Sequence, residues 1–472
     1  MADVDNYDQY NKNQAGVTKI AGGSPELSHQ NTIKKDEKPV PLYAYFAFYI
    51  LGVGSVMSLF VFILSIDYYK KVFDQENKKY IPSIFNLVFN LGSVFTSTFV
   101  AIPIQSYVRS HRIMFSLFTL NLIVLLCTVA VNYSSSLPSV YEKDSPTQSG
   151  VFSVVCIFVA VLGFSCGINT ACVFSVVNPI GPKYTSAVMG GIGSAGFLVA
   201  VFRMISLAVQ TAVPKTITNQ MIIVNVYFGI AALIQLICII VSGLLIKMSF
   251  TIVSIPRRNK DVEMPKVMDP QDFLERSNES MVVTTPQPKV QESVLDRIKD
   301  YLKTVWIAIA PGSNVYITFV ITYSLYPTIL ALYVSTMNQY FQESGFFVAT
   351  VLACYSLGDF LGRVLSVFKK VHFIPVNWMW LVVYARVLFY VLLILYLRYN
   401  LTIYDPLKIT GGFFMSLTGG YIGSVSMMQG AQRVKGKRYA GGAMTLFLNG
   451  GIASGAVLGV AIGFAVAKMP QS

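Results

Sequence analysis

The sequence predicts an all-α polytopic membrane protein with eleven transmembrane helices, arranged as six plus five in two bundles. Three observations predict this class. The 472-residue chain is 54% hydrophobic and 12% charged, with a mean hydropathy of +0.57, whereas an average soluble domain is about 25% charged. Apolar runs of about 20 residues recur along the chain, and each is long enough to cross ~30 Å of hydrocarbon. One long polar segment interrupts the series after the sixth run.

The apolar runs are expected to be helices rather than strands. Only helices or closed barrels satisfy every backbone polar group within lipid, and these runs are long and do not alternate. We expect the spans at residues 42–66, 81–104, 113–131, 151–179, 187–210, 220–246, 313–334, 345–368, 374–397, 408–429 and 440–467.

Two polar segments divide the chain into four predicted regions. Residues 1–41 are polar and mixed in charge, so we expect a cytosolic tail without a cleaved signal peptide. Residues 42–246 form the predicted six-helix bundle and residues 304–472 the five-helix bundle. The segment 247–303 between them holds ten basic and nine acidic residues and is rich in proline. This composition predicts a flexible cytosolic linker, with phosphorylation or partner binding as the alternative role.

The distribution of lysine and arginine predicts the orientation of the chain. With a cytosolic N-terminus, eighteen basic residues lie inside and nine outside, a bias of about two to one in the direction of the positive-inside rule. The C-terminus is then extracellular, and we expect the plasma membrane. The glycosylation sequons at Asn132 and Asn400 lie outside in this topology, and the one at Asn278 lies inside.

Several function classes find no support in the sequence. The formal charge of +13 is spread over the loops, so we expect no nucleic-acid partner, and three histidines and no catalytic or metal-binding motif argue against an enzyme. We expect no cofactor and no metal. The run Gly191–Gly196 matches a dinucleotide fingerprint by letter, but no strand precedes it. We interpret it, like the glycines spaced by four in the last span, as a helix-packing surface.

Away from their end residues, the predicted spans hold four charged residues: Arg203, Asp359, Arg363 and Arg386. A charge at mid-bilayer costs roughly 2.5–3.5 kcal/mol on insertion scales, so it is expected to face a wet cavity, a partner or a substrate. Asp359 and Arg363 are four residues apart and share one helix face. They are candidate substrate ligands, and an ion pair that only locks the fold is the alternative. For Arg203 and Arg386, a structural or gating role is as well supported as substrate binding.

Uncharged polar residues supply further candidates for a binding site. Asn86 and Asn90 share a face of the second span, and Asn169 and Thr170 lie midway along the fourth. Tyr323, Ser324 and Tyr326 come just before Pro327, where a missing amide hydrogen bond is expected to kink the helix and open a cleft. Asn and Thr also hold membrane helices together, so a purely structural role is the alternative.

Several motifs, taken jointly, resemble those of the equilibrative nucleoside transporter family. The resemblance runs from the first predicted span to the last. It rests on Leu51–Ser55, Pro182–Thr185, Met189–Gly196, Tyr326-Pro327, Asp359-Phe360-Leu361-Gly362-Arg363, Ala385–Phe389, Gly420-Tyr421 and Ala440–Met444. It implies a fold related to the major facilitator transporters, and alternating access around a central site between the bundles.

The resemblance also implies roles for particular residues. Asp359 and Arg363 match the family positions that face the ribose, and Ser356 lies one turn earlier on the same face. Ser58-Leu59-Phe60 stands where the family usually has Pro-Trp-Asn, and Thr170 stands where a glutamine commonly meets the base. Base preference is therefore the open point, and free bases are candidate substrates.

The leading hypothesis is an equilibrative carrier for nucleosides, nucleobases or both. Asp359 and Arg363 would bind polar groups of the substrate, and Leu59, Phe60 and Tyr326 would form the apolar wall. One alternative is a proton-coupled symporter with Asp359 as the proton site, and protons are then a partner. Another is a major-facilitator-like carrier for a different small polar solute.

Overall fold

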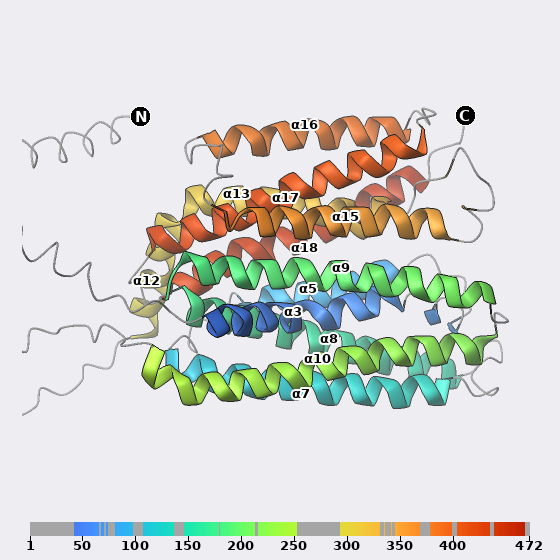
Figure 1. Cartoon of the computed structure of the whole chain (residues 1–472), viewed down its shortest axis with the longest axis horizontal. Helices are drawn as coiled ribbons and strands as arrows, with labels where there is room; N and C mark the ends of the chain where they lie inside the picture. The colour runs from blue at the N-terminus through green and yellow to red at the C-terminus, as the bar shows by residue number, and fades with distance from the viewer. Residues whose placement is uncertain are drawn as a thin grey trace, which may run out of the picture. The chain divides into compact units, whose positions relative to one another are not determined.

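Helices form along the apolar runs, because segments placed in lipid must satisfy their backbone polar groups internally. The computed structural model describes residues 42–65, 68–69, 72–73, 81–97, 107–135, 146–178, 180–212, 216–252, 293–330, 335, 341, 345–368, 378–398, 404–434 and 439–467. The elements within these ranges are α3 (Leu42–Leu64), α5 (Ile81–Phe95), α7 (Tyr107–Ser135), α8 (Pro146–Val177), α9 (Pro182–Ala212), α10 (Ile217–Ile252), α12 (Val294–Ile307), α13 (Ile309–Ser324), η4 (Leu325–Ile329), α15 (Phe346–Leu365), α16 (Met379–Arg398), α17 (Asp405–Arg433) and α18 (Ala440–Ala467) (Figure 1).

Each of the eleven predicted spans overlaps a described helix. By length and hydropathy, seven of the described helices are able to cross a membrane. They are α3, α7, α8, α9, α10, α15 and α18. An eighth is added if α12 and α13, which meet at an angle of 77°, form one broken span. A multi-pass helical membrane protein is therefore confirmed, and the number eleven stays a prediction.

Both ends of the predicted linker are helical. α10 continues to Ile252, and α12 begins at Val294. The side chain of Ser293 caps α12 by accepting a hydrogen bond of 3.2 Å from the Leu295 backbone N–H, which satisfies one of the donors that a helix start leaves unpaired. Residues 253–292 and the tail 1–41 lie outside the described residues, so their predicted flexibility and location stay predictions.

Helices from the two halves of the chain meet along two seams. In the first half, α8 contacts α5 and α7, and α7 contacts α10; in the second, α17 contacts α13 and α15, and α13 contacts α18. One seam joins α9 to α15 and α17, and the other joins α18 to α5 and α8. The division into bundles of six and five helices stays a prediction. The candidate site lies on the seam between α9 and α15.

Close helix approach accounts for the glycine-rich runs. A Cβ at Gly451 or Gly455 of α18 would lie 2.6 Å from the carbonyl oxygen of Tyr316 or Val320 on α13. Gly191 of α9 likewise faces the carbonyl oxygen of Tyr49 too closely for any side chain. Membrane helices use small residues in this way because lipid provides no hydrophobic drive for association. The interpretation of both runs as packing surfaces is confirmed.

The sequon at Asn132 is inside the protein rather than on its surface. Asn132 is 1% exposed. Its Oδ1 accepts a hydrogen bond of 2.9 Å from the Tyr69 hydroxyl, and its Nδ2 donates to Asn225 Oδ1 at 3.1 Å. A glycan must be attached to an accessible Nδ2, and Asn132 does not present one in this conformation; glycosylation of the protein stays a prediction. Asn278 and Asn400 lie outside the described residues.

Candidate functional site

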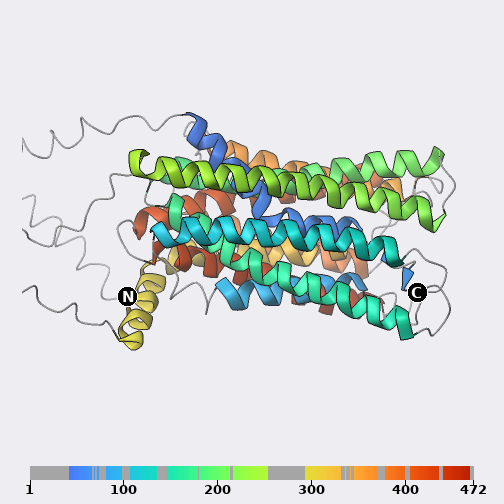
Figure 2. The same cartoon turned by 90° about the horizontal axis from the view of Figure 1, so that it is seen from below.

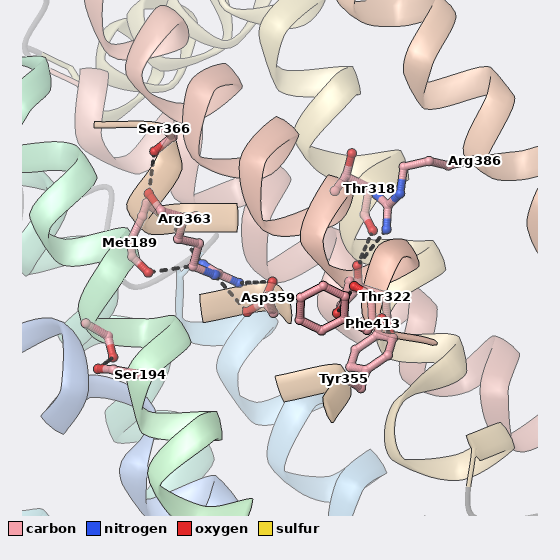
Figure 3. Close-up of polar contacts among 12 residues, drawn as sticks. Met189, Ser194, Thr318, Thr322, Tyr355, Asp359, Arg363, Ser366, Arg386 and Phe413 are labelled. Atoms are coloured by element: carbon pink, nitrogen blue, oxygen red, sulfur yellow. Dashed lines mark hydrogen bonds and ion pairs between the residues drawn. The ribbon is translucent and has the colours of Figure 1, made fainter. Parts of the chain in front are cut away.

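The site is built around one turn of α15. Asp359 and Arg363 are four residues apart on this helix, and the spacing brings their side chains together. Arg363 Nε lies 2.8 Å from Asp359 Oδ2, and Nη2 lies 3.3 Å from Oδ1. The guanidinium thus makes the two-point contact with a carboxylate that gives such pairs both strength and a fixed orientation. Figure 3 shows the pair.

The two partners differ in what else they contact. Arg363 is nearly enclosed, with its side chain 3% exposed, whereas the Asp359 side chain is 17% exposed. The remaining nitrogen, Arg363 Nη1, donates to the Met189 carbonyl oxygen of α9 at 3.4 Å, and the guanidinium lies 5.4 Å from the centre of the Phe319 ring. Arg363 is therefore held on several sides, and Asp359 is the partner with the more accessible polar group.

A small cavity of about 30 Å³ opens beside this pair. Helices of both halves of the chain line it: α3 and α9 from the first, and α13, η4 and α15 from the second. The lining residues are Phe60, Ile192, Gly193, Gly196, Thr322, Tyr323, Tyr326, Tyr355, Ser356, Asp359 and Arg363. The volume suffices for about one or two water molecules and is below the ~300 Å³ of a small ligand pocket. A substrate must therefore enlarge the cavity when it enters.

Aromatic rings form one wall of the cavity. Tyr326 stacks on Tyr355 with ring centres 5.5 Å apart and planes 15° from parallel, and Phe60 meets Tyr326 edge-on at 6.5 Å. Ser356 lines the cavity together with these rings. The wall thus presents flat apolar faces beside a carboxylate and hydroxyl groups. An arrangement of this kind suits a ligand that is partly aromatic and partly rich in hydroxyl or amine groups.

The helix break that brings Tyr326 to the cavity follows from the sequence. Tyr326 has a non-helical backbone, with φ −101° and ψ 131°. The ring of a following proline pushes the preceding residue toward this extended region, and Pro327 is that proline. The predicted kink before Pro327 is confirmed. The Pro327 side chain itself lies outside the described residues.

A second buried guanidinium lies behind the aromatic wall. Arg386 of α16 is 4% exposed, and its Nη2 donates to Thr322 Oγ1 at 3.4 Å and to the Met415 carbonyl oxygen at 3.2 Å. The Tyr355 hydroxyl also reaches Thr322, donating to its carbonyl oxygen at 3.4 Å. In Figure 3, Arg386 and Arg363 lie on opposite sides of Asp359 and Tyr355. Arg386 therefore contacts the lining residue Thr322 without lining the cavity.

Five of the ten predicted substrate residues line the cavity together: Asp359, Arg363, Ser356, Tyr326 and Phe60. Sequence reasoning missed Thr322 and Tyr355. Thr322 could have been predicted from helical spacing, because it is four residues before Tyr326. Tyr355 precedes Ser356 directly and was not recognised because its ring packs against a distant turn of the chain.

The other predicted residues are placed elsewhere. Leu59, Asn90, Asn169 and Thr170 are buried, but none lines the cavity. The Thr170 hydroxyl donates to the Cys166 carbonyl oxygen of its own helix at 2.8 Å, a common use of threonine within helices. Both amide atoms of Asn169 are without a hydrogen-bond partner in the described part of the chain.

Three predicted residues remain. The Asn86 side chain lies outside the described residues. Arg203 is half-buried on α9 and is not a lining residue, so its structural or gating role stays a prediction, as does the gating role of Pro327. No group of His, Cys, Asp and Glu that could hold a metal ion occurs within the described ranges.

Comparison with known proteins gives consistent matches along the chain. A family model described as "Nucleoside transporter" matches residues 156–464. Two Arabidopsis thaliana proteins are similar: "Equilibrative nucleotide transporter 1", 22% identical over 94% of this chain and 92% of the relative, and "Equilibrative nucleotide transporter 7", 24% identical over 87% and 92%.

Solved structures match in fold. A bacterial homologue of the iron transporter ferroportin in an outward-facing state superposes with a TM-score of 0.54 at 11% identity, covering 90% of this chain and 93% of that one. A Major Facilitator Superfamily transporter, FucP, gives 0.48 at 13% identity, covering 90% and 96%. At such identities the first likeness shows a shared fold and nothing of the substrate. The predicted all-α fold is thereby confirmed.

Proposed function

Because this chain belongs to the nucleoside transporter family, we propose that it is an equilibrative carrier for nucleosides, nucleobases or both. The membership agrees with the motif resemblance to the equilibrative nucleoside transporters. Substrate binds between the two halves of the chain, at the seam of α9 and α15, and the halves then rock to expose it to the other side. No covalent chemistry is involved.

The observation that supports this proposal is the Asp359–Arg363 pair in a cavity lined by both halves of the chain. The accessible Asp359 carboxylate can accept hydrogen bonds from ribose hydroxyls, and the guanidinium can donate in a fixed fork. The Tyr326–Tyr355 stack provides a flat surface for a base. As the cavity enlarges, Arg363 exchanges its contact with the Met189 carbonyl for one with substrate.

Uptake by cells that lack purine transport tests the proposal. Labelled adenosine, inosine, uridine and hypoxanthine are compared in cells expressing the wild type, Asp359→Ala or Arg363→Ala. Thr410→Ala is the control, because its hydroxyl is exposed and donates to a carbonyl of its own helix. Each site variant is expected to lose at least tenfold in saturable uptake at equal surface abundance. Unchanged uptake in both variants would falsify the site assignment. Unlabelled solutes are also added as competitors of labelled adenosine uptake, and competition only by solutes unrelated to nucleosides would indicate a different carrier.

A proton-coupled carrier is the second candidate, since Asp359 is the acidic residue among the described residues that line the cavity. Uptake is measured with and without an inward pH gradient of one unit. The equilibrative mode predicts the same final accumulation in both. A gradient-driven accumulation above the external concentration that disappears in Asp359→Asn would favour symport.

The proposed carrier lies in the plasma membrane, with a cytosolic N-terminus and an extracellular C-terminus. Epitope tags at the two ends, probed in intact and permeabilised cells, test this orientation. Staining of the C-terminal tag without permeabilisation is the expected result. Staining of the N-terminal tag in intact cells would reverse the proposed topology.

A further inference from the structure

α12 differs from the neighbouring helices in direction. It is bent by 77° from α13, across a break at Ala308. Figures 1 and 2 both show it at the end of the helix assembly where α13 begins, running across the long axes of the other helices. If α13 crosses the bilayer, a helix at this angle lies close to the membrane plane. This geometry was not apparent from composition, which predicted a flexible linker for most of the segment.

One face of α12 fixes it to the rest of the protein. Tyr301 and Thr304 are buried, and the Tyr301 ring meets Tyr439, the residue before α18, edge-on at 5.9 Å. The Ser293 cap fixes its start, and Ala308 ends it. Its orientation about its own axis is therefore set by this contact.

A second face, roughly 130° around the helix from Tyr301 and Thr304, carries a stripe of exposed apolar side chains. Leu295, Ile298, Leu302 and Trp306 are between 39% and 72% exposed. At about 100° per residue, these four positions fall within an arc of roughly 80° around the helix. A stripe on one face of an amphipathic helix, with Trp and Leu among its members, is the pattern of helices that lie in a membrane interface.

The charged residues of α12 are sorted around the stripe. At the same rotation per residue, Lys299 and Lys303 lie roughly 20° and 60° beyond one edge of the stripe, and Asp296 and Asp300 lie farther round on that side. The fifth charged residue, Arg297, falls on the buried side, between Thr304 and Tyr301. Lysine side chains in this position extend toward lipid headgroups while their apolar stems stay with the acyl region. They also favour anionic headgroups, by about 1 kcal/mol or fivefold per residue near the surface. The acidic side chains are then directed toward water.

We propose that α12 is an interfacial helix whose exposed stripe is covered by the lipid bilayer. Leu295, Ile298, Leu302 and Trp306 enter the boundary between headgroups and acyl chains, and Lys299 and Lys303 contact anionic headgroups. The stripe continues into the exposed apolar surface at the start of α13, where Ile309 is 43% exposed, and this continuity favours lipid over a segment of residues 253–292 as the occupant. The proposal is independent of the transported substrate.

Tryptophan fluorescence tests the depth of the helix in the intact protein. The chain has three tryptophans, so Trp378→Phe combined with Trp380→Phe leaves Trp306 as the reporter. The variant is reconstituted into phosphatidylcholine vesicles with 30% phosphatidylserine, containing lipids brominated near the headgroup or near the chain end. Stronger quenching by the shallow bromines is expected. Absence of quenching would mean that protein or water covers the stripe, and stronger quenching by the deep bromines would mean a re-entrant span; either result overturns the proposal.

Matched variants in the same background separate lipid contact from general disturbance. Leu302→Glu lies within the stripe and is expected to reduce shallow quenching at least twofold, whereas Asp300→Asn, two residues earlier and outside it, leaves quenching unchanged. Lys299→Glu with Lys303→Glu is expected to reduce shallow quenching in vesicles that contain phosphatidylserine more than in vesicles of phosphatidylcholine alone. Because all four side chains are exposed, folding does not depend on them. Equal effects of Leu302→Glu and Asp300→Asn contradict the assigned face.

Discussion

Gly193 of α9 and Arg363 of α15 are in direct contact across the seam between the two halves of the chain. A Cβ at position 193 would lie 2.6 Å from Arg363 Cδ and 3.0 Å from Nε. The same Nε makes the contact of 2.8 Å with Asp359. The lack of a side chain at 193 therefore leaves the space in which the guanidinium reaches its carboxylate.

Gly193→Ala is expected to displace the Arg363 side chain and weaken substrate binding. Overpacking of a tight contact costs about 1–3 kcal/mol, so the KM for nucleoside uptake should rise about tenfold. Gly190→Ala on the same helix is the control, because its Cβ would lie 3.5 Å from the Tyr49 ring, an ordinary contact. Equal KM values for the two variants contradict the role assigned to Gly193.

Arg386→Met is expected to lower transport without lowering stability. Nε and Nη1 of Arg386 lack hydrogen-bond partners within the described residues, and a buried charge that is incompletely hydrogen-bonded carries a desolvation cost that an apolar side chain of similar size does not. Uptake falls because Thr322 loses its contact with the guanidinium. The Tm in detergent and uptake at equal surface abundance are measured together. A strongly lowered Tm would show instead that Arg386 mainly holds the helices together.

Gly420→Ala is expected to destabilise the crossing of α15 and α17. An added Cβ would overlap the Asp359 carbonyl oxygen, which belongs to the backbone and cannot rotate away. We expect a loss of about 1–3 kcal/mol, seen as a lowered Tm in detergent. Gly411→Ala on the same helix should be silent, because its Cβ would lie 3.9 Å from the Phe389 ring. If Gly411→Ala lowers the Tm as much, the cost does not come from this crossing.

No glycan is expected on Asn132. In an Asn400→Gln variant, Asn132 is the remaining sequon on the predicted outer side, and treatment with an N-glycosidase should leave the electrophoretic mobility of the protein unchanged. The reason is the burial of Nδ2 and its hydrogen bond to Asn225. A shift in mobility would mean that this side chain reaches the surface during synthesis.

Local rules account for the parts of the site that the sequence predicted correctly. The spacing of four residues is sufficient to pair Asp359 with Arg363, and Pro327 is sufficient to break the helix at Tyr326. The placement of Asn169 and Thr170 depends on the rotation of α8 against its neighbours, which a nearly uniform apolar sequence does not specify. The contact of Arg386 with Thr322 joins residues 64 positions apart, and spacing within one helix holds no record of it.

α12 was overlooked for a different reason. Its five charged residues lower the average hydropathy of the segment, so composition groups it with the polar stretch before it. The arrangement of those charges around the helix axis, rather than their number, separates it from a linker.

The volume of the cavity has a consequence for measured affinity. The site has space for about one or two waters. Substrate therefore binds only to the fraction of molecules in which α9 has separated from α15. If that fraction is about 1%, the apparent Kd is about 100-fold weaker than the intrinsic one. Substitutions that loosen the seam of α9 with α15 and α17 away from the lining residues can therefore tighten apparent binding without touching the substrate.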